Sequence, residues 1–446
     1  MKNSKENLIT LAEYLVEFGR KKGADEIEVS ILQENEFNVH IRMKEIESLV
    51  EAHSKKLQIR IIKDKKIAVS TSEDFSQEIL ENLISTTLER AKISNPDDFI
   101  GLPEKQELKV DLDSLNIYDS KILELSPEEK INFAVQIERI ALMDKRISNS
   151  HGVTFGTKEI ERILVNSKGF EGQYSETVFS ISIGLQAEKK GEKVDGFWYC
   201  AKRHFGELDK PEEIAREAVR RTVRQLGARK VKTQNVPIIL EPIITAELLS
   251  FLFTCVSGIS IYRKSSFLVD KLGEKIANDS INVIDNGLMR GKLGTRPFDN
   301  EGMLTRKTYA IKRGILENYL CNSYSARKLN LKSTGNCTGR GVGPNNFYLV
   351  PGKKSQEEII KSVDKGLLVT RTIGHGFNPV TGDISRGAFG LWIEKGEIAY
   401  PVSEITISGN LGRILKDISI IGNDIDFRSH YAGPTIKIEE MTVGGI

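Results

Sequence analysis

The segment GLLVTRTIGHGFNPVTGDISRGAFGLWIEKGEIAYPVSEITISGNL, from Gly366 to Leu411, is the stretch that decides the fold of this chain. Apolar residues recur through 389–393 and 398–407, and the polar turn Glu394-Lys-Gly-Glu397 lies between them. This pattern predicts two strands joined by a hairpin. The glycines on either side of His375 indicate that the backbone approaches a neighbouring segment closely.

Strand patterns also dominate the sequence around this segment. Further strands are predicted at 236–240, 281–285, 308–311 and 418–421. One short buried helix is predicted at 244–254, and helical periodicity fades after it. The sequence therefore predicts a strand-rich C-terminal domain over 231–446.

The first half of the chain mixes the two periodicities. Helices are predicted at 8–18, 76–92, 126–141 and 211–226, and strands at 27–31, 37–41, 57–61, 67–69, 163–165 and 178–185. Ser126, Pro127 and Glu129 form a capping-box signature at the start of the third helix. A basic string from Ala228 to Asn235 is the best candidate linker. An α+β domain over 1–230 with a mostly antiparallel sheet is expected, and the fold class is α+β.

Composition limits the function classes. The chain has 446 residues, long enough for two or more substructures, and its 64 basic and 62 acidic residues leave a net charge of +2. This nearly neutral charge does not predict a positive electrostatic field that would attract polyanions such as nucleic acids. The N-terminus lacks the uninterrupted apolar run of a signal peptide, and the most apolar window is too short to span a membrane. Four scattered cysteines without a C-x-x-C pair favour a reducing cytoplasm.

The histidines argue against a zinc helix. A metallopeptidase helix carries two histidines on one face and a glutamate that activates water. The six histidines of this chain stand alone, and no two are three to five residues apart. The segment Ala246 to Gly258 contains no histidine, and Glu247 is its only acidic residue.

Residues 366–411, together with Tyr262-Arg-Lys-Ser-Ser266 and the closing residues 440–445, strongly resemble the TldD/PmbA family, also called the modulator of DNA gyrase family. The catalytic TldD branch of that family has H-E-x-x-x-H on a helix and a third zinc ligand from a C-terminal cysteine. The corresponding segments here, 246–258 and 425–433, lack the histidines and the C-terminal cysteine respectively. The chain therefore resembles the TldE/PmbA branch.

The resemblance implies the partner subunit of a heterodimeric zinc metallopeptidase that acts on unfolded peptides or leader peptides. It implies no catalytic residue, no metal ligand and no cofactor in this chain, which is expected to be inactive alone. Zinc is expected in the TldD-like partner. Loops of the chain are candidate peptide or partner contacts, through Arg263, Lys264, Cys337, Arg340, His375 and Asn378.

Other readings of particular residues remain open. Cys255 is a candidate nucleophile, but its apolar surroundings favour a small buried side chain over a reactive thiol. The glycine-rich loop 333–343 matches no phosphate-binding motif and is more typical of a surface connection. Arginines at 216, 220 and 224 could meet nucleic acid, as in a gyrase-associated or nucleic-acid-binding regulator, but interleaved glutamates favour a salt-bridged face. A homodimeric peptide-binding protein is a further alternative.

Overall fold

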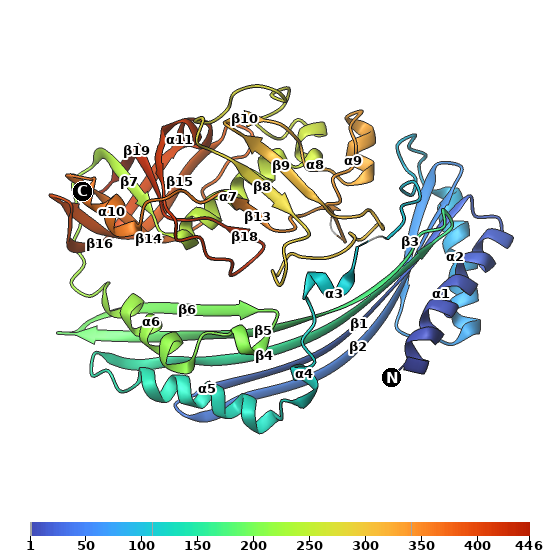
Figure 1. Cartoon of the computed structure of the whole chain (residues 1–446), viewed down its shortest axis with the longest axis horizontal. Helices are drawn as coiled ribbons and strands as arrows, with labels where there is room; N and C mark the ends of the chain where they lie inside the picture. The colour runs from blue at the N-terminus through green and yellow to red at the C-terminus, as the bar shows by residue number, and fades with distance from the viewer. Residues whose placement is uncertain (1, 109, 340) are drawn as a thin grey trace.

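The computed structural model describes residues 2–108, 110–339 and 341–446. A long, curved sheet made by the N-terminal half lies beneath a C-terminal half built around two further sheets (Figure 1). The fold class is α+β, as the sequence predicts. None of the helices in the described ranges combines the length and the apolar character needed to cross a membrane.

The N-terminal sheet is antiparallel throughout and has the strand order β3-β2-β1-β4-β5-β6. Its strands are β1 (Glu26–Arg42), β2 (Glu45–Lys63), β3 (Lys66–Ser72), β4 (Ile147–Asn166), β5 (Glu171–Lys189) and β6 (Glu192–Lys202). The predicted strands at 27–31 and 37–41 are two ends of the single strand β1. The polar residues between them remain paired with β2 and β4, so their polarity marks a less covered part of the sheet.

Two pairs of helices cover one face of this sheet, one pair toward each end of its long strands (Figure 1). Helices α1 (Lys2–Lys21) and α2 (Gln77–Ile93) pack on β1 to β4, and α5 (Pro127–Ala141) and α6 (Pro211–Val223) pack on β1 and on β4 to β6. The predicted capping box of α5 is confirmed: Ser126 accepts from the Glu129 N–H at 3.2 Å, and the Glu129 carboxylate accepts from the Ser126 N–H at 2.8 Å. Short turns α3 (Leu112–Leu115), α4 (Lys121–Glu124) and η1 (Phe205–Glu207) complete this half.

The main C-terminal sheet has the order β16-β15-β14-β7-β19-β17, and an added pairing between β16 and β19 closes it into a barrel. Its strands are β7 (Gln234–Leu240), β14 (Lys365–Ile373), β15 (Asp383–Glu394), β16 (Glu397–Asn410), β17 (Ile418–Ile421) and β19 (Ile436–Gly444). The predicted hairpin is confirmed, because β15 and β16 pair antiparallel across the turn at 394–397.

A second C-terminal sheet has the order β10-β9-β8-β13-β18, and a small hairpin stands apart from it. The strands of these parts are β8 (Val283–Asn286), β9 (Lys307–Lys312), β10 (Ile315–Leu316), β13 (Phe347–Leu349), β18 (Tyr431–Ala432), β11 (Cys337–Thr338) and β12 (Gly341–Val342). Helices are more frequent here than the sequence pattern suggests: α7 (Pro242–Val256), α8 (Gly258–Tyr262), α9 (Ser323–Lys328), α10 (Gln356–Lys361) and α11 (Leu411–Asp417). Most are shorter than two full turns, so their periodicity is hard to detect.

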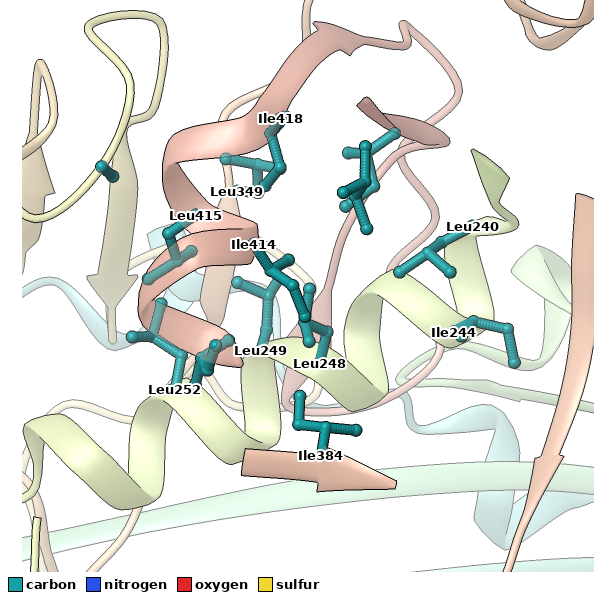
Figure 2. Close-up of a cluster of buried hydrophobic side chains, with 14 of the residues drawn as sticks. Leu240, Ile244, Leu248, Leu249, Leu252, Leu349, Ile384, Ile414, Leu415 and Ile418 are labelled. Carbon is teal, nitrogen blue, oxygen red and sulfur yellow. The ribbon is translucent and has the colours of Figure 1, made fainter. Parts of the chain in front are cut away.

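Helix α7 lies at the centre of the C-terminal core. Leu248, Leu249 and Leu252 on α7 point toward α11, which contributes Ile414 and Leu415 to the same cluster (Figure 2). All five side chains are buried. The opposite side of α7 is less buried, and it faces the N-terminal sheet across a cleft.

Candidate functional site

A cleft with a volume of about 770 Å³ lies between the two halves of the chain. Strands β4 to β6 and helix α6 form the N-terminal wall, and α7, β14 and the β18 region form the C-terminal wall. Its lining residues are His151, Gly184, Asp195, Gly196, Phe197, Tyr199, Arg221, Arg224, Gln225, Ile243, Ile244, Ala246, Glu247, Ser250, Thr370, Arg371, Thr372, Ser429 and Tyr431. A mixed apolar and polar cleft of this size is typical of a ligand site.

The C-terminal wall presents one acidic residue of α7. The Glu247 carboxylate accepts short hydrogen bonds from Arg386 on β15 and from the hydroxyl of Thr372 on β14. Arg386 is also an ion-pair partner of this carboxylate, and its guanidinium is largely buried. Glu247 is therefore held by the barrel and is not a free base.

The N-terminal wall presents a paired imidazole and carboxylate. His151 Nε2 on β4 lies 2.8 Å from Asp195 Oδ1 on β6. The hydrogen bond from His151 lowers the pKa of Asp195 below its usual value. The carboxylate of Asp195 therefore orients the imidazole of His151, and both side chains stay about half exposed.

The arginines of α6 meet the C-terminal half at Glu241. Arg224 donates to both oxygens of Glu241, at 2.6 and 2.9 Å, and Arg221 donates to Oε2 at 3.0 Å. Arg220 and Arg221 also bond to Glu217 on the same helix. The predicted salt bridges on α6 are therefore present, but Arg221 and Arg224 are largely buried rather than solvated.

Strand β6 is an edge strand, and its exposed edge faces the cleft. The Asp195 carbonyl accepts from Arg371 and Gln225 at 3.2 and 3.1 Å, and the Tyr199 carbonyl accepts from Arg428 at 2.7 Å. Phe197, midway between them, is 54% exposed and stacks on Tyr199 with the ring centroids 5.5 Å apart. Strand alternation directs the N–H and C=O of Phe197 to the same side as those two carbonyls.

The donor set of the cleft does not fit a zinc ion. His151 and Asp195 are bonded to each other, and Glu247 is bonded to Arg386 and Thr372. Across residues 2–108, 110–339 and 341–446, no three His, Cys, Asp or Glu side chains gather in a way that could hold a metal ion. Zinc in a peptidase needs at least three such donors converging on one point.

The residues that the sequence singles out as contacts lie outside the cleft lining. Arg263 and Lys264 follow α8 and are exposed, and His375 and Asn378 are exposed in the connection between β14 and β15. The two loops are neighbours, because the Phe267 N–H donates to the Pro379 carbonyl at 2.9 Å. Arg340 lies outside the described residues. The role of these loops as contact surfaces stays a prediction.

Both singled-out cysteines are buried. Cys255 is fully buried in α7, and burial raises its thiol pKa to about 12. Cys337 is 5% exposed, and burial followed by the charges of Glu301 and Asp299 raises its thiol pKa well above the usual value. The structure therefore agrees with the interpretation of Cys255 as a small buried side chain.

Sequence reasoning missed most of the cleft. His151 is visible in the sequence only as an isolated histidine, and Asp195 and Phe197 lie on β6, which is absent from the strands that the sequence predicts. Residues 194–200 alternate between more and less buried positions in the structure, but the sequence offers only the short aromatic run 197–199 as a strand signal.

Three family models match the chain in succession. They are PmbA/TldA metallopeptidase domain 1 over residues 27–91, the central domain over 120–226 and the C-terminal domain over 233–445. The chain is 35% identical to the metalloprotease PmbA of Escherichia coli O157:H7, over 96% of this chain and 93% of that protein.

Two crystal structures have the same fold. One is a candidate modulator of DNA gyrase from Thermotoga maritima, with a TM-score of 0.90 and 26% identity over 98% of this chain and 99% of the other. The second is TldE from Thermococcus kodakarensis, with a TM-score of 0.88 and 26% identity over 98% of this chain and 100% of the other.

Proposed function

This chain belongs to the PmbA/TldD metallopeptidase family, and on that premise we propose that it is a TldE-like subunit, inactive alone, that holds unfolded or leader peptides for a zinc-bearing, TldD-like partner. In that assembly the zinc ion bound by the partner would activate the attacking water. The residues of this chain supply the walls that bind and orient the peptide. The proposal places the protein in a reducing cytoplasm, which fits four cysteines that are free and buried.

The observation that carries this proposal is the surface that α7 presents to the cleft. Its lining residues are Ile243, Ile244, Ala246, Glu247 and Ser250, which include no imidazole and no thiol. The one carboxylate among them is already bonded to Arg386 and Thr372. The α7 wall can therefore contact a peptide, and it presents neither a metal-binding imidazole nor a thiol.

The edge of β6 offers a way to bind peptides at Phe197, which lies between the Asp195 and Tyr199 carbonyls that already accept from side chains. An extended peptide that adds to a sheet edge is held through its main chain, so its side chains matter little for affinity. The outward N–H and C=O of Phe197 are suitably placed, and the Phe197 and Tyr199 rings offer an apolar platform beside them. Unfolded peptides fit this edge, because a folded substrate has few main-chain groups left to pair.

A role in nucleic-acid binding receives less support. Arg220, Arg221 and Arg224 are bonded to Glu217 and Glu241, and the net charge of the chain is only +2. Counterion release requires free cationic groups.

The decisive experiment mixes this chain with a TldD-like sister from the same organism. We expect that this chain alone leaves an unfolded peptide intact, that the sister alone cleaves it weakly, and that the mixture cleaves it in a chelator-sensitive way. Elemental analysis of the pure chain is expected to find no stoichiometric zinc. Cleavage by this chain alone that resists chelators and is lost in Cys255→Ala would instead identify a cysteine hydrolase.

A pair of variants at Phe197 separates main-chain from side-chain binding. Phe197→Pro removes an outward N–H, and an edge strand tolerates proline where no ladder bond is lost. We expect this variant to weaken peptide binding by the mixture more than Phe197→Ala, which keeps the N–H. Equal losses in the two variants would show that the ring, and not the strand edge, holds the peptide.

A further inference from the structure

Another pocket of the C-terminal half lies beside strand β9 and is separate from the cleft. It has a volume of about 490 Å³, and we call it the β9 pocket. Its lining residues are Leu272, Arg306, Lys307, Thr308, Tyr309, Glu317, Asn318, Tyr319, Leu331, Lys332 and Thr334. None of these residues lines the cleft. A pocket of this size can hold a small organic molecule.

The walls of the β9 pocket carry more positive than negative charge. Arg306, Lys307 and Lys332 are exposed cations, and Glu317 is the one acidic residue of the lining. In the described ranges, none of the three cations forms an ion pair with an acidic side chain. The adjoining Lys271, by contrast, has an acidic partner 3.0 Å away. Uncompensated cations on the walls of a pocket attract an anionic ligand.

Arg306 is a partly desolvated cation. Burial lowers the pKa of its guanidinium, and the charge of Asp299 opposes this effect only in part. In the described part of the chain, Nη2 of Arg306 donates to the Ser333 carbonyl, and the other N–H groups have no acceptor. A guanidinium has five N–H donors and suits the paired oxygens of a phosphate or a carboxylate. An anion in the pocket would therefore supply a counter-charge and further acceptors.

The ring of Tyr309 positions ammonium groups beside the pocket. The Lys307 ammonium lies 5.3 Å from the ring centroid, and the Lys312 ammonium lies 5.4 Å from it. The electrons of an aromatic ring attract a cation placed over its face. Lys312 is not a lining residue, but it adds to the positive charge next to the pocket. The ring therefore holds Lys307 in place without neutralising its charge.

Two leucines give the same pocket an apolar side. Leu272 and Leu331 both line it, and they are 41% and 36% exposed. Exposed apolar side chains inside a pocket gain free energy when a ligand covers them. Because they lie in one pocket with uncompensated cations, they favour a ligand that combines an anionic group with an apolar body.

We propose that the β9 pocket binds a small phosphate monoester. Arg306, Lys307 and Lys332 hold its phosphate group. Leu272 and Leu331 contact its apolar body. Three cations and one carboxylate leave the walls with a net charge of +2, and a phosphate monoester carries about −1.5 to −2 at neutral pH. A phosphate therefore balances this charge better than a single carboxylate does. The site goes beyond the proposed peptide-binding function, because it shares no residue with the cleft.

Isothermal titration calorimetry with adenosine monophosphate tests the proposal, because this probe joins a phosphate to an apolar ring system. Adenosine and inorganic phosphate each lack one of these parts, and each is expected to bind about tenfold more weakly than the probe. Arg306→Gln and Lys332→Gln are expected to weaken binding of the probe about tenfold and about threefold, respectively. Glu317→Gln removes the one negative charge of the walls and is expected to strengthen binding about threefold.

Arg139→Gln is the matched control, because it removes the same charge at an exposed residue of α5, in the N-terminal half. It is expected to leave binding of the probe unchanged. Thermal unfolding without the probe shows whether each variant is folded. Lys332→Gln tests the site even if Arg306→Gln unfolds, because the Lys332 side chain has no hydrogen-bond partner in the described ranges.

Three results would overturn the proposal. The first is that the natural chain does not bind adenosine monophosphate at millimolar concentrations. The second is that the probe binds no more tightly than adenosine or inorganic phosphate. The third is that Lys332→Gln and Glu317→Gln bind the probe as the control does, because the probe would then lie outside the β9 pocket.

Discussion

Arg224 and Glu241 connect the two halves of the chain through a bidentate pair, with Nη1 to Oε1 at 2.6 Å and Nη2 to Oε2 at 2.9 Å. Arg224 follows directly after α6, and Glu241 is the residue before α7. Glu241 is only 2% exposed. The pair therefore fixes the distance between the helices that form two walls of the cleft, and it does so away from solvent.

Glu241→Gln is expected to lower the free energy of unfolding by about 3 kcal/mol, because Arg221 and Arg224 would stay buried without their counter-charge. Burial alone would raise the pKa of Glu241, but hydrogen bonding and charge from Arg224, with the charge of Arg221, hold it below the usual value. Since the folded-state pKa is lowered, this stabilisation is present above the unfolded pKa and is lost as pH falls through the folded value.

Urea unfolding at neutral pH and at a series of acidic pH values measures both effects. Glu357→Gln is the control, because Glu357 forms an exposed ion pair with Lys361 on α10 and should matter little. Equal stability of the two variants at neutral pH would show that losing the Glu241 charge costs no more than losing the exposed charge of Glu357.

The four thiols are expected to be unreactive in the folded protein. Burial raises the pKa of Cys200, of Cys255 to about 12 and of Cys321 to about 11, and it also raises that of Cys337. A thiol reagent at mildly alkaline pH should therefore label none of them rapidly, and all four after denaturation. Fast native labelling that is lost in Cys255→Ala would show a reactive thiol in α7.

Glu301→Gln is expected to flatten the pH dependence of stability near neutrality. Burial, and then the charge of Glu301, raise the pKa of Asp299 to about 7. Because this pKa is raised in the folded state, the contribution of Asp299 is fully present below its ordinary pKa of 3.8 and is lost as pH rises through about 7. The glutamine keeps an oxygen to accept from the Ser323 N–H, which is 2.6 Å away, but removes the neighbouring charge.

The measurement is urea unfolding between about pH 5 and about pH 8, where the natural chain should lose stability more steeply than the variant. Glu274→Gln, which removes an exposed carboxylate, is the control and should keep the slope of the natural chain. Identical slopes for the natural chain and Glu301→Gln would mean that the two buried carboxyl groups do not interact.

Gly376→Ala is expected to destabilise the loop between β14 and β15. A Cβ at this position would lie 1.6 Å from the Ser385 carbonyl oxygen, so the backbone would have to move. Overpacking of this kind costs about 1–3 kcal/mol. Thermal unfolding measures the loss, and Gly206→Ala is the control because nothing lies within 4 Å of its added Cβ. A stable Gly376→Ala variant would show that the loop adjusts freely.

The sequence predicts best those features whose determinants are local. Ser126 and Glu129 are three residues apart, so the capping box can be read directly from the sequence. The same signal at Ser355 and Glu358 lies before a helix of six residues, too short for a periodic pattern. Strand β14 is missing from the predicted strands. It pairs with β7 on one side and with β15 on the other, and its consecutive residues 366–370 are all buried, so both faces of the strand are covered and its sequence does not alternate.

The cleft is less predictable because its residues meet only through the topology. His151 and Asp195 come from strands that are separated in order by β5, and Glu247 meets Arg386 across 139 residues. No spacing rule connects residues so far apart in the chain. The close approach predicted for the glycines beside His375 is confirmed at Gly376, which lies against Ser385, but is wrong at Gly374, where an added Cβ would meet nothing within 4 Å.

Strand β19 is the last strand of the barrel in chain order, and this order affects how the protein is made. Strand β19 fills the gap between β7 and β17 and also pairs with β16, so the barrel closes through residues 436–444. Domains form as the ribosome synthesises the chain, from the N-terminus onward. During translation the N-terminal sheet can be complete while the barrel still has open edges on β7 and β16. A ribosome that stalls before residue 436 would therefore hold a chain with exposed strand edges, which chaperones and proteases can recognise.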